Sequence, residues 1–62
     1  MAERQLSEAE RMEAFLALVQ SQDSGADVAS SRRSVADRYG LSEQQVRLIE
    51  REGIDAGWPP LG

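Results

Sequence analysis

Apolar side chains recur every three or four positions through the first third of the chain, which is the period of an amphipathic helix. Met12, Phe15 and Val19 share one side of this helix, and glutamate and arginine side chains fill most of the other side. The run Ser-Glu-Ala-Glu at residues 7–10 has the pattern of a capping box. The sequence therefore predicts an acidic amphipathic helix over residues 7–21.

A second helix is expected after the helix-breaking run at residues 21–25. Val35, Ala36 and Tyr39 fall on one side of it, and Gly40 ends it. Ala36 is small enough to let two helices approach closely, and Gly40 supplies the positive φ that a sharp turn requires. The segment that follows has the length of the turn in a helix-turn-helix.

The third predicted helix begins at Ser42, where Ser-Glu-Gln-Gln forms a second capping-box pattern. Val46 and Ile49 then lie on one face, which we expect to be buried. Gly53 is the expected end of the helix, because it lets Ile54 touch Ile49 in a Schellman-type ending, with Gly57 as the alternative. The helix-turn-helix is thus expected over residues 28–53.

The chain closes with a Trp-Pro-Pro segment that cannot be helical at its prolines, so residues 57–62 are predicted to form an extended tail. Trp58 either folds back over the small core or serves as part of a docking strip for a partner. The expected fold class is all-α: one small three-helix domain over residues 1–62, containing a helix-turn-helix and ending in the extended tail.

The composition excludes most catalytic mechanisms, because the 62-residue chain contains no Cys, His or Lys. The chain therefore has no thiolate nucleophile, no nucleophile activated by histidine, and no Cys or His ligands for a zinc ion. So short a chain can hardly enclose a pocket that excludes water. We expect no enzyme activity, no catalytic residue, no cofactor and no metal site. The chain also lacks an apolar run long enough to span a membrane and shows no signal peptide, so a cytoplasmic protein is expected.

Residues 34–54 resemble the helix-turn-helix of region four of bacterial RNA polymerase sigma factors. The core of the likeness is Val-Arg-Leu-Ile-Glu at residues 46–50, which is close to the V/I-R-x-I-E run of that family. In that family the second helix of the motif enters the major groove of a promoter element, and the domain also rests on a flap of the polymerase. The resemblance implies a transcription-linked module that binds DNA or polymerase.

The resemblance also assigns the candidate DNA-binding residues, which lie opposite the apolar face of the third helix. Gln44 can pair bidentately with adenine and Arg47 with guanine. Arginines near the second predicted helix, which is the first helix of the motif, are candidates for phosphate contacts that set the register on DNA. The groove-facing candidates are Ser42, Glu43, Gln44, Arg47 and Arg51, and the phosphate-contacting candidates are Arg32, Arg33 and Arg38.

The charge balance weakens the expected affinity for DNA, because this small acidic protein has a formal net charge of −4. Residues 30–62 carry five arginines and five acids, whereas residues 1–29 carry two arginines and six acids. Affinity for DNA depends largely on cations that neutralise phosphates, so binding by the chain alone should be weak. The first hypothesis is accordingly a small DNA-binding transcription regulator that acts as a homodimer or beside a larger basic protein.

The second hypothesis is a protein-interaction module that uses the same scaffold on RNA polymerase or another regulator. The acidic first helix favours it, because this helix would complement a basic partner surface. A purely structural helical domain is a third possibility. The candidate docking residues are apolar: Leu18, which widens the first helix's apolar side, Leu48, which can also meet a thymine methyl, Trp58 and Leu61.

Overall fold

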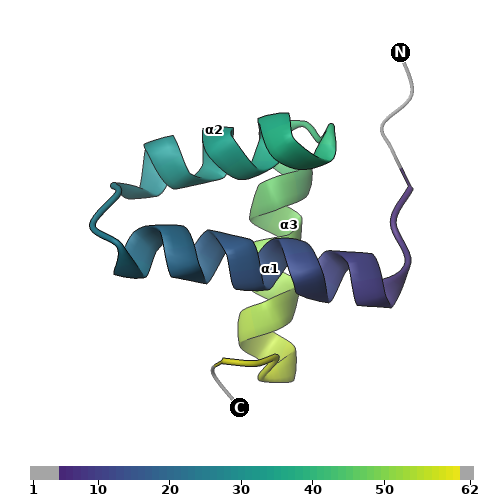
Figure 1. Cartoon of the computed structure of the whole chain (residues 1–62). Helices are drawn as coiled ribbons and strands as arrows, with labels where there is room; N and C mark the ends of the chain where they lie inside the picture. Colours follow the sequence, from purple (N-terminus) through teal and green to yellow (C-terminus); the bar gives the residue numbers. More distant parts are fainter. Residues whose placement is uncertain (1–4, 61–62) are drawn as a thin grey trace.

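Three helices joined by two short connections make up residues 5–60, the part of the chain that the computed structural model describes. Helix α1 spans Glu8–Asp23, α2 spans Val28–Tyr39 and α3 spans Glu43–Ala56. In Figure 1, α1 and α2 run side by side in opposite directions, and α3 crosses behind both. No strand occurs among the described residues, so the all-α prediction is confirmed. None of these helices is both long and apolar enough to cross a membrane.

Both predicted capping boxes are present. The Glu10 backbone N–H donates to Ser7 Oγ at 3.2 Å, and the Ser7 N–H donates to Glu10 Oε1 at 2.9 Å. Ser42 and Gln45 form the same pair of bonds at 3.1 Å each, and these bonds start α3. These local bonds satisfy N–H groups that a helix cannot bond internally. Helix α1 ends two residues beyond its predicted end, at Asp23.

Asp27 caps α2, since its carboxylate accepts from the Ser30 backbone N–H at 2.7 Å. The bonds to Ser30 lower the pKa of the Asp27 carboxyl below its usual value, and the positive charge of Arg33 adds a smaller effect in the same direction. The charged form is also favoured by the positive end of the helix dipole. Asp27 is therefore the N-cap of α2, and the helix begins at Val28.

Gly40 ends α2 in the left-handed conformation that the sequence predicted, with φ of 68°. The Leu41 N–H donates to the Ala36 carbonyl at 2.8 Å, so the backbone bonds of the last turn are satisfied while the chain reverses. Three residues, 40–42, then connect α2 to α3. An L side chain at Gly40 would be strained by this φ.

The expected end of α3 at Gly53 is wrong; the helix continues to Ala56, and Gly57 caps it with φ of 67°. Gly53 is buried inside the helix against the ring of Phe15 from α1. A Cβ atom at Gly53 would lie 2.7 Å from Phe15 Cγ and closer still to Cδ1. The glycine is therefore required by the close approach of two helices. Ile54, expected against Ile49, is 58% exposed.

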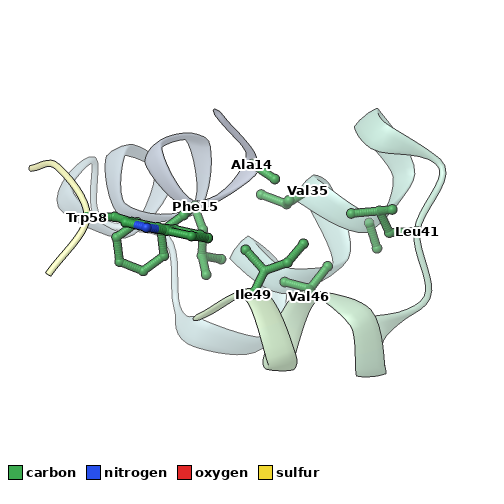
Figure 2. Close-up of a cluster of buried hydrophobic side chains, with 9 residues drawn as sticks. Ala14, Phe15, Val35, Leu41, Val46, Ile49 and Trp58 are labelled. Carbon is green, nitrogen blue, oxygen red and sulfur yellow. The ribbon is translucent and has the colours of Figure 1, made fainter. Parts of the chain in front are cut away.

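The core lies between all three helices and Trp58, which follows the C-cap of α3 (Figure 2). Phe15 is 1% exposed, and its ring meets the Trp58 ring edge to face, with centroids 6.0 Å apart and planes at 77°. The Trp58 backbone N–H donates to the Gly53 carbonyl at 2.9 Å. The buried apolar residues are Ala14, Phe15, Leu18, Val35, Ala36, Leu41, Val46, Ile49 and Trp58.

Burial in this core contradicts the prediction that Leu18 and Trp58 are docking residues. Leu18 is 1% exposed and Trp58 is 6% exposed, so neither side chain is available to a partner. Trp58 instead folds back over the core, which is the first of the two interpretations of the tail given above. Pro59 and Pro60 form a turn, where the sequence predicted an extended tail. Leu61 lies outside the described residues.

Candidate nucleic-acid interface

Helix α3 has one face in the core and the opposite face exposed. Val46, Ile49 and Gly53 are buried at three- and four-residue spacing. The same spacing on the opposite side produces a continuous exposed stripe along the helix. We call this stripe the outer face of α3; its members are Gln44, Arg47, Leu48, Arg51, Ile54 and Asp55.

The predicted base-reading residues fall on this outer face or at its N-terminal end. Gln44, Arg47 and Arg51 are exposed and separated by three and four residues, so they project from one side of α3. Glu43 is exposed in the first turn. Ser42 is exposed as well, but its hydroxyl accepts from the Gln45 backbone N–H as the helix cap.

Two acids of α3 are held by arginines from the other helices. Glu50 Oε1 accepts from Arg32 Nη2 at 2.7 Å and from Arg32 Nε at 3.1 Å. Glu52 accepts from Arg11 through both carboxylate oxygens, at 2.9 and 3.3 Å. Arg11 also donates to the Leu6 carbonyl at 2.8 Å, which fixes its orientation. The negative charge of both glutamates on the flanks of α3 is therefore neutralised within the fold.

The three arginines of α2 that the sequence assigned to phosphate contacts lie in different surroundings. Arg32 is engaged by Glu50 and is 26% exposed, so its guanidinium does not extend freely into solvent. Arg38 lines a hollow between α1 and α2 with Ala17, and its guanidinium lies 5.6 Å from the centre of the Tyr39 ring. Arg33 is exposed on α2. Arg32 is therefore the candidate that is joined to α3 by an ion pair in the described part of the chain.

Sequence reasoning missed the pairing of Arg11 with Glu52 and the exposure of Ile54. Arg11 is an arginine among the glutamates of the first helix, which could have indicated an ion pair. Its partner Glu52 lies far away in the chain, so the sequence does not identify it. Leu48, a predicted docking residue, is 60% exposed, and with Ile54 it forms the two most exposed large apolar side chains of the described residues. The outer face therefore combines two cations, an amide, an acid and apolar groups.

No protein-family model, curated protein or solved structure matches the chain. An amide and two guanidinium groups on one helix face can form paired hydrogen bonds with base edges, and the guanidinium groups can also contact phosphates. Among residues 5–60, neither Arg47 nor Arg51 makes an ion pair, so both groups are free for an external acceptor.

Proposed function

We propose that the protein is a small helix-turn-helix DNA-binding protein linked to transcription, in which α3 is the recognition helix. Helix α2, the turn at residues 40–42 and α3 would form the motif, and the outer face of α3 would enter the major groove. The observation that carries this proposal is the single exposed stripe holding Gln44, Arg47 and Arg51. The wide major groove of B-form DNA admits one α-helix presenting such side chains.

The ion pairs at Glu50 and Glu52 support this proposal. A carboxylate beside the recognition helix repels phosphates, and both glutamates lie on the flanks of the outer face of α3, where each lines a hollow with Arg51. Their arginine partners remove this repulsion without adding a cation that could bind DNA strongly. Binding by one chain alone should therefore be weak and sensitive to salt.

The experiment that tests the proposal is a fluorescence anisotropy titration of short random-sequence duplexes at about 50 and 200 mM salt. We expect weak binding that decreases with salt, and a loss of about tenfold or more when Arg47→Ala and Arg51→Ala are combined, because two cations that can neutralise phosphates are removed. The matched control combines Arg33→Ala with Arg38→Ala, which removes the same charge from α2. Equal losses from both pairs, or no binding at low salt, would overturn the proposal.

A second prediction concerns Arg32 as a partner of Glu50. Arg32→Ala should weaken DNA binding about fivefold, because it leaves the Glu50 charge facing the phosphates at a cost of about 1 kcal/mol. Adding Glu50→Gln to this variant should restore the affinity of the original chain. If Arg32 instead contacts phosphate directly, as the sequence suggested, the second substitution will not restore binding. Anisotropy on the same duplexes measures all three chains.

A protein-interaction module that binds RNA polymerase or another regulator is the second candidate function. The outward side of α1 favours it: Met12 and Leu16 border an apolar hollow with Pro59, and Glu13 stands beside them. An acidic and apolar surface of this kind fits a basic protein partner. Co-purification with polymerase that survives nuclease treatment supports this candidate, and an association that requires nucleic acid counts against it.

A further inference from the structure

A shallow hollow on the outward side of α1 is separate from the DNA-binding surface proposed above. Apolar side chains of α1 at three- and four-residue spacing line it, and they are joined by a proline after α3: Ala9, Met12, Leu16 and Pro59. Glu13 is the one charged side chain among the described residues that line it. Leu16 is 37% exposed, although apolar burial is the main source of stability in so small a domain. Within residues 5–60 the fold therefore leaves an apolar surface open here.

The charged residues on the outward side of α1 are all acidic. Glu13 lines the hollow, and Glu8 and Asp23 stand toward the two ends of the helix. All three are exposed, and within the described part of the chain none of them makes an ion pair. Arg11, the arginine of α1, is instead bound to Glu52 of α3. The outward side of α1 therefore presents apolar and negatively charged groups together, with no cation of its own helix to neutralise them.

We propose that this hollow is the docking site for a basic amphipathic helix of another protein. Exposed apolar residues at three- and four-residue spacing form the kind of ridge against which a second helix packs. A large apolar side chain of the partner would enter the hollow between Leu16 and Pro59, and arginine or lysine side chains beside it would reach Glu13. This docking mode rests on the second candidate function above and gives it a site and a partner chemistry.

Charge selects this partner over other occupants of the hollow. The unpaired acids would repel the phosphates of a nucleic acid or of an anionic membrane, and they would repel an acidic polypeptide as well. A second copy that presented the same face would place the acidic side chains of one α1 beside those of the other. A basic amphipathic helix gains both apolar contact and attraction between opposite charges.

The hollow and the outer face of α3 are different surfaces. Arg47 and Arg51 do not line the hollow, so a partner docked there leaves both guanidinium groups available to DNA. Affinity for DNA depends largely on cations, and the chain itself has a formal net charge of −4. A partner rich in arginine or lysine would supply phosphate contacts that this chain lacks.

The test uses a fluorescently labelled synthetic peptide of about 15 residues, with leucines along one helical face and arginines elsewhere. Its anisotropy should show binding by the full chain at about 150 mM salt. Glu13→Arg should weaken this binding at least about tenfold, because it turns an attraction into a repulsion. Leu16→Gln should weaken it about fivefold, because it removes apolar contact from the hollow. The same peptide with glutamates in place of its arginines should not bind.

The matched controls change exposed residues of the other two helices in the same way. Asp37→Arg on α2 changes the net charge by as much as Glu13→Arg, and Leu48→Gln on α3 matches Leu16→Gln. Each control should change the affinity for the peptide by less than about twofold, because charges far from the contact are screened by salt. Equal losses from the α1 variants and their controls overturn the proposal, since the attraction would then be that of the whole acidic chain.

A peptide that does not bind even at about 50 mM salt also overturns the proposal. Sedimentation equilibrium tests the remaining occupant: a chain that associates with itself, and loses this association with Glu13→Arg, uses the hollow for a second copy and overturns the proposal as well. Both substituted positions are exposed, so circular dichroism should show the helical spectrum unchanged. If Leu16→Gln lowers the helix content, the comparison of Glu13→Arg with Asp37→Arg decides.

Two further measurements separate this site from the functions proposed above. Glu13→Arg should not weaken the binding of random duplexes, in contrast to the combined substitution of Arg47 and Arg51. A chain that binds the peptide at α1 without co-purifying with polymerase supports the docking site and excludes polymerase as the partner. Co-purification with polymerase by a chain that does not bind the peptide supports the second candidate function and overturns this site.

Discussion

Trp58→Ala should lower the free energy of unfolding by about 3–5 kcal/mol, the usual effect of truncating a buried aromatic side chain. The Trp58 ring is 6% exposed and packs edge to face on Phe15, which itself forms the centre of the core. A domain of this length has a total stability of only about 3–9 kcal/mol. The variant is therefore expected to be partly unfolded at room temperature. Urea unfolding followed by far-ultraviolet circular dichroism measures the change, since the chain then lacks its only tryptophan fluorophore.

Leu48→Ala is the matched control for this prediction, because it also removes a large apolar side chain but at a position that is 60% exposed. It should change stability by no more than about 0.5 kcal/mol. If Trp58→Ala has an effect as small as that of the control, the tail does not complete the core. The docking interpretation of Trp58 would then be restored.

Gly53→Ala should lower the free energy of unfolding by about 1–3 kcal/mol, the usual cost of overpacking a filled core. Helix propensity alone predicts the opposite sign, because alanine in a helix interior is about 1 kcal/mol more favourable than glycine. The added Cβ would lie 2.7 Å from Phe15 Cγ, and a ring that is 1% exposed has no free space into which to move. Chemical unfolding of the two chains under identical conditions gives the sign directly.

Phe15→Leu provides the control, because the smaller side chain leaves room beside position 53. In that background the cost of Gly53→Ala should fall by at least about 1 kcal/mol, a coupling of the size found between side chains in direct contact. Additive effects of the two substitutions would mean that α1 and α3 do not meet as closely as described. A Gly53→Ala variant more stable than the original chain would lead to the same conclusion.

The features that the sequence predicted well are those decided by neighbouring residues. The capping boxes at Ser7 and Ser42 need only a polar side chain and its partner three residues later. The role of Gly40 could be predicted for the same reason, because a sharp turn between two helices requires a residue with positive φ at that point of the chain. The number of helices and the burial of Val46 and Ile49 follow from the spacing of apolar residues.

The features that the sequence did not predict depend on contacts between distant segments. Gly53 and Gly57 both match the pattern of a helix end, and only the position of Phe15 on another helix decides between them. The partners of Glu50 and Glu52 are set by how α1 and α2 cross α3, which the order of charges along the chain does not specify. The prediction that Arg32 contacts phosphate was therefore made without knowledge of its ion pair with Glu50.

The most direct measurement of the central claim is a titration of the ¹⁵N-labelled chain with short duplex DNA at low salt, followed by the amide and arginine chemical shifts. The account predicts that the largest changes occur at Gln44, Arg47 and Arg51, with the amides of Met12 and Leu16 on α1 nearly unaffected. Changes concentrated on α1, or none along α3 at saturating DNA, would contradict the assignment of the outer face of α3 as the surface that binds DNA.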